Sequence, residues 1–357
     1  MQQGVMQAVL VREVGGYELT ELPVPEPGPG EALIRVSVTG LCRTDLKIIR
    51  HGHRDLTLPR VPGEEVVGEV VALGPPRRPP ADPASVASGP EGAAAPAHQV
   101  SFGDRVYVYP GMWCGACPSC RRGAENLCRK MRIMGFHRDG GFAEYAAAPL
   151  QSLIPVPDGL SDEEAVFAEP LSCCLNALEL GGVGEGDVLG IWGAGPAGTL
   201  LSRAGALRGA EPVVIEPDER RRALACGHAA PPGPVDVAIV AIGAPEAYLE
   251  ALGALAPRGR LVVFSGLLPE ADAALHVSLS GLHYHEQTIV GAYGCAFRHG
   301  EAALELLGSG RLRVDDLVSH RLPLRDLERG LDIVARRTGM KVHLYPDPAR
   351  IPERSSQ

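Results

Sequence analysis

Residues 188–198 read VLGIWGAGPAG, a short apolar run followed directly by a glycine-rich turn. The pattern Gly193-x-Gly195-x-x-Gly198 is weak evidence alone, but here it follows a strand-like run and opens an Ala/Leu-rich helical stretch. Gly193 permits the tight turn, Gly195 lets a pyrophosphate approach the backbone at the helix N-terminus, and Gly198 permits close packing of helix on strand. The stretch predicts a dinucleotide-binding βαβ unit.

Glu216 ends the next apolar run, PVVIE, at about the 20-residue distance expected of a ribose-binding acid. Its carboxylate would accept the ribose hydroxyls of NAD and repel the 2′-phosphate of NADP; the alternative is a solvated acid at a strand end. Arginines 220–222 would hold a phosphate or stack on adenine, which keeps NADP open. The predicted cofactor-binding residues are Gly193, Gly195, Pro196, Ala197, Gly198, Glu216, Arg221, Ile242, Gly243, Ser265 and Gly266.

Two patterns of periodicity divide the chain. Residues 5–72 alternate short β-branched runs with Pro/Gly punctuation, which is typical of a small all-β unit. From about 169 to 298, apolar runs of strand length alternate with helical stretches, as in a parallel βαβ sheet. We therefore predict an α/β protein with a β domain over 1–168, a doubly wound parallel-sheet domain over 169–298, and a return to the first domain over 299–357.

Two segments modify this organisation. The stretch after the arginines leaves little room for a further strand and helix, which predicts an abbreviated half of the parallel sheet. Residues 75–99 carry Pro, Ala, Gly and Ser with almost no large apolar side chains, which favours a surface loop or a disordered insert.

Length and charge restrict the class of protein. The 357 residues exceed a typical domain of about 100–200 residues, so two domains are expected. A net charge of −9, a pI near 5.7 and the lack of a basic block argue against nucleic acid or an anionic membrane as partner. We expect a small-molecule ligand. Neither a secretion signal nor a membrane-spanning run stands out, so a cytoplasmic location is predicted.

Four of the nine cysteines, Cys114, Cys117, Cys120 and Cys128, are spaced C-x2-C-x2-C-x7-C. In a reducing compartment such clustering favours a metal over disulfides. Four thiolates at this spacing predict a tetrahedral structural zinc; a reactive cysteine cluster and an Fe–S site are the alternatives. A zinc without an open coordination position would stabilise the lobe and do no chemistry.

Residues 61–71, VPGEEVVGEVV, place Glu64 and Glu65 side by side before a buried-looking strand. Neighbouring side chains on a strand point to opposite faces, so both acids cannot lie on one solvent face. We infer that at least one is held by a positive charge.

Eight segments occur in the order found in zinc-dependent medium-chain dehydrogenases/reductases, a family that the chain resembles along almost its whole length. They are GLCRTDLK (40–47), GEE (63–65), GDRVYVYP (103–110), the four-cysteine lobe, GGFAEY (140–145), EPLSCCLNAL (169–178), GAGPAG (193–198) and GMKV (339–342). The resemblance is greatest to the polyol dehydrogenase branch. It implies a GroES-like β domain, a Rossmann domain, a cleft between them, and a homodimer or homotetramer.

In that family the catalytic metal is held by the Cys of C-G-T-D, the His and Glu of G-H-E, and sometimes the Glu of E-P-L. By motif these positions are Cys42, Glu64, Glu65 and Glu169, with Glu64 standing where the family has histidine. The resemblance thus implies that a metal cation compensates the two acids. An added anionic donor weakens the Lewis acid, so we expect less lowering of the pKa of bound water toward about 7 and less secure zinc selectivity.

The predicted catalytic residues are Thr44, Asp45 and Glu64. Thr44 would relay the proton of the substrate hydroxyl, with a turn-capping hydroxyl as the alternative, and Asp45 is expected to orient the loop. His283 and His285 alternate as on a strand. Lys341 and Arg298 are expected near the cofactor or the cleft.

Three functions follow from these expectations. The first is an NAD-dependent, metal-assisted oxidation of a secondary alcohol on a polyol, cyclitol, amino-cyclitol or sugar-like substrate. The second is a medium-chain reductase of an enone or imine that lacks the catalytic zinc. The third is a non-catalytic cofactor-binding scaffold.

Overall fold

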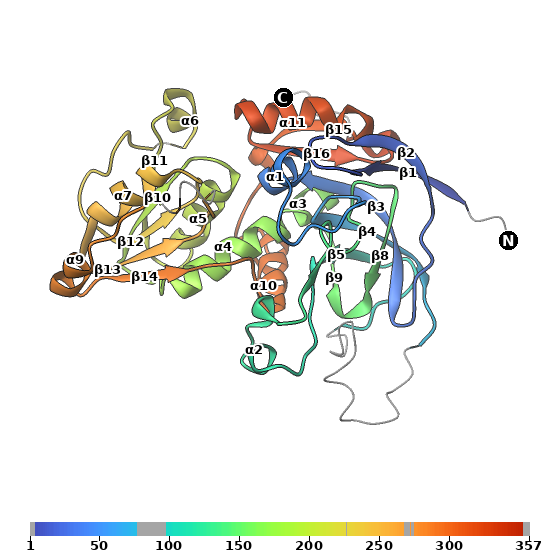
Figure 1. Ribbon diagram of the computed structural model, residues 1–357, viewed down its shortest axis with the longest axis horizontal. Coiled ribbons are helices and arrows are strands. Elements are labelled where there is room, and N and C mark those ends of the chain that lie inside the picture. The colour runs from blue at the N-terminus through green and yellow to red at the C-terminus, as the bar shows by residue number, and fades with distance from the viewer. Residues whose placement is uncertain (1–3, 77–97, 226, 268–271, 273–274, 353–357) are drawn as a thin grey trace. The chain divides into compact units, whose positions relative to one another are not determined.

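The computed structural model describes residues 4–76, 98–225, 227–267, 272 and 275–352 (Figure 1). The chain forms two compact units. Unit 1 comprises Met1–Glu169 and Ala296–Gln357, and unit 2 comprises Pro170–Cys295. The loop predicted at 75–99 lies almost wholly outside the described residues. No helix in the described ranges is both long enough and apolar enough to cross a membrane.

Unit 2 is built on a five-stranded, all-parallel sheet, which confirms the predicted α/β class. In order across the sheet its strands are β11 (Glu211–Ile215), β10 (Val188–Trp192), β12 (Val235–Val240), β13 (Leu255–Val263) and β14 (Thr288–Gly291). The helices are α5 (Pro196–Ala206), α6 (Glu219–Leu224), α7 (Pro245–Gly253) and α9 (Leu279–His285). In β10 all but the first residue are buried, because the strands of a parallel sheet are covered on both faces.

The shortened half of this sheet appears where it was predicted. In the described part of the chain, β11 is an edge strand, and the segment after α6 adds only an isolated bridge between Ile215 and His228. The 19 residues between β11 and β12 already carry the one crossover that joins these strands. An additional strand would need a second crossover of a dozen or more residues, for which there is no room.

Unit 1 contains a seven-stranded sheet. Across it lie β15 (Val318–Pro323), β16 (Lys341–Tyr345), β3 (Glu31–Leu41), β4 (Glu65–Leu73), β5 (Arg105–Val108) and β9 (Leu153–Pro155), while β8 (Tyr145–Pro149) also pairs with β3. Two small ladders join β1 (Val5–Leu10) to β2 (Glu18–Pro23) and β6 (Gly111–Met112) to β7 (Arg132–Ile133).

Helices complete unit 1. They are α1 (Arg43–His51), α2 (Pro118–Arg121), α3 (Asp162–Ala165), α10 (Phe297–Gly308) and α11 (Leu327–Arg336), and α4 (Ala168–Leu180) begins here and continues into unit 2. Short 3₁₀ turns cover Glu125–Leu127, Leu150–Ser152, Asp315–Leu317, Leu324–Asp326 and Pro348–Arg350.

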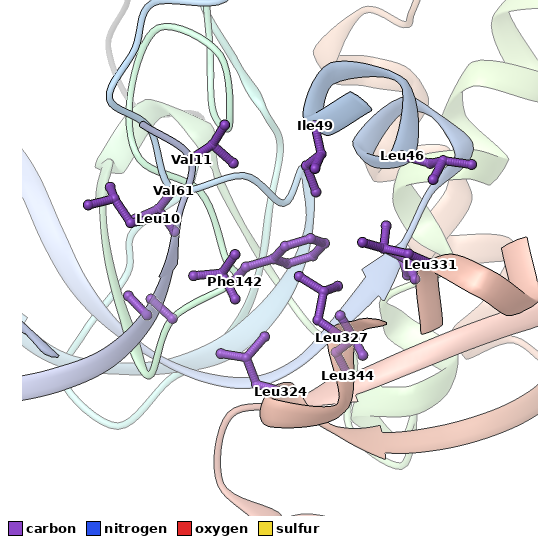
Figure 2. Packing of buried hydrophobic residues seen from close by; sticks show 14 of the residues in the cluster. Leu10, Val11, Leu46, Ile49, Val61, Phe142, Leu324, Leu327, Leu331 and Leu344 are labelled. Carbon is purple, nitrogen blue, oxygen red and sulfur yellow. The ribbon is translucent and has the colours of Figure 1, made fainter. Parts of the chain in front are cut away.

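One face of the unit 1 sheet packs on an apolar core (Figure 2). The ring of Phe142 lies among Ile49 of α1 and Leu327 and Leu331 of α11. Leu344 joins this cluster from β16, as does Val342. Because successive side chains of a strand point to opposite faces, Lys341, His343 and Tyr345 point the other way. The strand is buried along its whole length, so its polar face is buried too.

The prediction of a strand at His283 and His285 is wrong. Both residues lie in α9, which begins where the Ser278 side chain accepts a hydrogen bond from the N–H of Gly281 and ends at Glu286 in the left-handed conformation. Two histidines over three positions are too short a pattern to separate strand from helix, and a local cap decided the outcome.

Candidate active site

The four spaced cysteines come together in unit 1. The Sγ atoms of Cys117 and Cys120 lie 3.5 Å apart, as do those of Cys114 and Cys128. The Cys114–Cys120 and Cys117–Cys128 pairs are 3.9 Å apart. Sulfur atoms at the corners of a zinc tetrahedron with Zn–S near 2.3 Å are about 3.8 Å apart. The thiols therefore already have the spacing that zinc requires.

Within the lobe, a backbone N–H group favours the thiolate of Cys117, whereas burial raises the pKa of the Cys120 and Cys128 thiols. The N–H of Cys120 helps to lower the pKa of the Cys117 thiol to about 6. The lobe is fastened to α10, because Glu125 accepts a 2.7 Å hydrogen bond from the N–H of Phe297, and the Phe297 ring packs against Trp113. Arg298, expected near the cofactor or cleft, donates to the carbonyl of Gly123.

Cys42 caps the first turn of α1. Its Sγ accepts from the N–H of Thr44 at 3.4 Å, and the Asp45 carboxylate accepts from the N–H of Cys42 at 2.8 Å. Burial raises the pKa of the Cys42 thiol, and the nearby carboxylates of Glu65, Asp45 and Glu169 raise it further while Lys341 opposes them. Burial also raises the pKa of Asp45 to about 7.

A positive charge compensates Glu65, and it belongs to Lys341. The two side chains form an ion pair in which Lys341 is 5% and Glu65 1% exposed. Gly40 leaves the space for this pair, since a Cβ atom there would lie 1.8 Å from Oε2 of Glu65 and 3.0 Å from Cε of Lys341. The sequence placed Lys341 near the cleft without naming Glu65 as its partner.

Glu64 and Glu169 are half-buried, Glu64 directly before β4 and Glu169 in the first turn of α4. Among the described residues, only the four lobe cysteines bring three or more potential metal-ligand atoms within 4.8 Å of one another. The potential ligand atoms of Cys42, Glu64, Glu65 and Glu169 are thus less closely spaced than the four thiols of the lobe. The carboxylates of Glu65 and Glu169 nevertheless raise the pKa of Cys42, so these two lie near the thiol.

In unit 2 the glycine-rich turn has the geometry that the sequence predicted. Gly193 has φ +112°, and a Cβ at Gly198 would lie 1.8 Å from the carbonyl oxygen of Gly193. Gly195 is the N-cap of α5, Pro196 lies in its first turn, and Ala197 follows. The uncapped N–H groups of this helix are a ready site for a phosphate.

Glu216 supports this turn directly. It is 7% exposed, its Oε2 accepts from the N–H of Ala194 at 2.9 Å and its Oε1 from the N–H of Asp218 at 3.1 Å. A Cβ at Gly195 would lie 3.1 Å from Nη2 of Arg221, so the guanidinium reaches the turn. Nε of Arg221 is buried without a hydrogen-bond partner among the described residues.

Of the remaining predicted cofactor residues, Ile242 borders this turn, and Gly243 lies beside Gly266. A Cβ at Gly193 would meet Cγ2 of Ile242 at 2.6 Å, and one at Gly243 would meet the carbonyl oxygen of Gly266 at 3.1 Å. The Ser265 carbonyl accepts a hydrogen bond from the hydroxyl of Tyr248. These residues follow the carboxyl ends of β12 and β13, where ligands bind in open parallel sheets.

Known proteins resemble the chain in both sequence and structure. Residues 28–158 match the alcohol dehydrogenase GroES-like domain. The chain is 33% identical to an L-threonine 3-dehydrogenase of Pyrococcus horikoshii over 344 residues, covering 88% of this chain and 91% of that protein. The chain belongs to the medium-chain dehydrogenase/reductase family. The predicted family and fold class are confirmed.

Other members of the medium-chain dehydrogenase family are similarly close. A D-altritol 5-dehydrogenase of Agrobacterium fabrum is 32% identical over 340 residues, covering 90% of this chain and 94% of that protein. A zinc-binding dehydrogenase from Sinorhizobium meliloti bound to NADP superposes with a TM-score of 0.82 at 29% identity, covering 96% of this chain and all of the other. The protein is an oxidoreductase.

Two groups of this medium-chain dehydrogenase were missed from the sequence: His343, and Glu163 with its partners. His343 lies on the polar face of β16 with Lys341, and Glu163, in α3, lies against His343. The alternation K-V-H-L-Y over residues 341–345 was the available signal, since it predicts a strand with one polar face.

Proposed function

We propose that this protein is an NAD-dependent oxidoreductase that reversibly oxidises a secondary alcohol of a polyol, cyclitol, amino-cyclitol or sugar-like substrate. The observation that carries the proposal is the thiol of Cys42 surrounded by the carboxylates of Glu65, Asp45 and Glu169, in a chain that also has the glycine-rich turn. The names of two relatives support the substrate class, since carbon 3 of threonine and carbon 5 of altritol both carry secondary hydroxyls.

Cys42, Glu64 and Glu169 would hold a catalytic metal, with Glu65 as a further donor. Their thiolate and carboxylate chemistry fits a divalent cation, because like charges this close need compensation beyond the single ammonium of Lys341. Bound there, zinc would supply Lewis-acid polarisation of the substrate hydroxyl. Thr44, whose N–H donates to Sγ of Cys42, would pass on the hydroxyl proton, and Asp45 holds the Cys42 backbone in place.

Unit 2 would bind the coenzyme. The N-terminus of α5 would take the pyrophosphate, and Glu216 would accept a ribose hydroxyl while it holds the turn through Ala194. Because Glu216 would repel a 2′-phosphate, we expect NAD to be preferred. Because Arg221 would contact a phosphate, we expect NADP to be accepted as well. The structure of the relative from Sinorhizobium meliloti, which contains NADP, is consistent with the acceptance of NADP.

The test is an alcohol panel assayed with NAD and NADP, read beside the zinc content before and after chelation. The proposal expects turnover of at least one polyol or cyclitol and two zinc ions per chain. The variant Glu64→His, which restores the family's ligand, should keep or increase affinity for the second metal. Glu69→His is the matched control, because Glu69 lies five residues further on, in β4, is also half-buried, and is paired with Arg35.

The Lys341–Glu65 ion pair favours a second candidate function, that of a medium-chain reductase without the catalytic metal. In that case the ammonium already compensates the buried acid, and Glu64 would act as an acid/base or anchor a substrate amine. One zinc per chain, with reduction of an enone or imine and no alcohol oxidation, would select this reading over the first.

A homodimer or homotetramer is also part of the proposal. In the described residues β14 is an edge strand with mostly exposed side chains, and the neighbouring Leu279, Tyr284 and Tyr293 are 77%, 80% and 49% exposed. Apolar groups beside an open sheet edge favour association. Light scattering coupled to size-exclusion chromatography would show a mass of two or four chains, and a monomer would contradict the proposal.

A further inference from the structure

His343 is the unexplained member of the polar face of β16. Its side chain has no exposed area, yet among the described residues neither Nδ1 nor Nε2 has a hydrogen-bond partner. Leaving one buried polar group unpaired costs about 1–3 kcal/mol. The other face of the strand carries the apolar residues Val342 and Leu344. The unpaired histidine is therefore explained either by a function or by a buried water molecule.

The sheet register places His343 beside the candidate active site. Its Cα partner in β3 is Gly40, and the partner of Gly40 in β4 is Glu65. Paired residues of adjacent strands point to the same face. Gly40 has no side chain, and the Lys341–Glu65 ion pair occupies that space. His343 is therefore the next side chain in the row after the ion pair.

On its other side, His343 faces the carboxylate of Glu163. Nδ1 lies 3.9 Å from Oε1 of Glu163, so a ring movement of about 1 Å would form a hydrogen bond. Arg321, the β15 partner of His343, holds this carboxylate with two hydrogen bonds of 2.6 and 3.0 Å. The hydroxyl of Tyr345 donates to the same group.

Glu163 and Tyr345 form part of the wall of a cavity of about 630 Å³. Arg105 and Asp162 also line it, and their side chains are 39% and 27% exposed, so the cavity communicates with solvent. The buried row thus runs from the Lys341–Glu65 pair, past His343, to Glu163 at a wet surface.

We propose that His343 is a proton-relay residue, which carries the proton released by alcohol oxidation from the interior beside Glu65 to the cavity at Glu163. The proposal rests on the proposed function. Oxidation sends a hydride to the coenzyme and frees the hydroxyl proton. Neutral His343 forms an N–H bond with a proton delivered through water and breaks an N–H bond to release a proton to cavity water.

The surrounding charges suit this role. Burial lowers the pKa of His343, and the Lys341 ammonium lowers it further, while Glu163 and Glu65 oppose them, so the ring is neutral at rest and able to accept. Burial raises the pKa of Glu163, but the nearby His343 ring and the hydrogen bonds from Arg321 and Tyr345 outweigh burial and lower this pKa to about 2. Glu163 therefore stays ionised and stabilises the transient imidazolium instead of trapping the proton.

The kinetic test compares His343→Leu with Val342→Ala, a packing control on the opposite face of the same strand. His343→Leu should lower kcat for alcohol oxidation about tenfold or more near neutral pH and change the pH–rate profile, with KM for the coenzyme unchanged. In His343→Ala, added imidazole should restore kcat in a concentration-dependent way. Val342→Ala should lose stability but keep the wild-type profile.

A second measurement does not need turnover. Hydrogen–deuterium exchange at the ring C2 position, followed by mass spectrometry, should show His343 exchanging through water although it has no exposed area, with exposed His283 as the fast reference. A folded His343→Leu with the wild-type kcat and profile, or a His343 ring that does not exchange in active enzyme, would overturn the relay. Failure of the wild type to oxidise any alcohol would instead refute the proposed function.

Discussion

Lys341 and Glu65 lie 276 positions apart in the sequence and form an ion pair that is almost completely buried. Taking two charges out of water is costly, and an ion pair repays the cost only while both partners remain. Glu65 therefore depends on Lys341 whether or not a metal also binds.

Breaking this pair should be strongly destabilising. Lys341→Met leaves a buried carboxylate without its cation and should lower the free energy of unfolding by about 3–5 kcal/mol in urea denaturation. Arg12→Met, which removes an exposed ion pair with Glu18, should change it by about 1 kcal/mol or less. If Lys341→Met/Glu65→Met were no more stable than Lys341→Met alone, the loss could not be assigned to the unpaired charge.

Removing one thiol of the lobe should remove its zinc. Cys120→Ser leaves three thiolates, so we expect the zinc content to fall by one per chain and the thermal midpoint to drop, at roughly 2–4 °C per kcal/mol lost. Cys173→Ser, a half-buried cysteine on α4 outside the lobe, is the control. Equal zinc content in both variants, measured by plasma mass spectrometry, would rule out the lobe as the site.

The stability of the fold should fall on the acid side because His343 is buried in its neutral form. The unfolded chain binds a proton at this residue below about pH 6.5, whereas the folded protein, with its lowered pKa, does not. The free energy of unfolding therefore decreases as the pH falls through 6.5. His343→Leu should flatten this slope in urea titrations, and an unchanged slope would contradict the assignment.

An alanine at Gly198 should disturb the coenzyme site. Its Cβ would lie 1.8 Å from the Gly193 carbonyl oxygen, so the turn must move, at a cost of about 1–3 kcal/mol and with weaker NADH binding. Gly184→Ala, also in unit 2, meets no atom within 4 Å and should bind NADH like the wild type. Fluorescence titration with NADH distinguishes the two, and equal affinities would be against the predicted site.

The sequence by itself determined the features whose partners are close along the chain. Gly193, Gly195 and Gly198 act within a single turn, and the four cysteines lie within 15 residues, so short-range spacing specifies both geometries. The parallel sheet and its shortened half also followed from local periodicity and from the number of residues available for a crossover.

Only the tertiary structure decided which charge meets Glu65, and that His343 lies between the Lys341–Glu65 pair and Glu163. These contacts depend on how β15, β16, β3 and β4 pair, and register is not encoded in any one strand. A strand sequence shows that one face is polar, but the neighbours of its polar side chains come from other segments, from 22 residues away for Arg321 and His343 to 276 for Glu65 and Lys341.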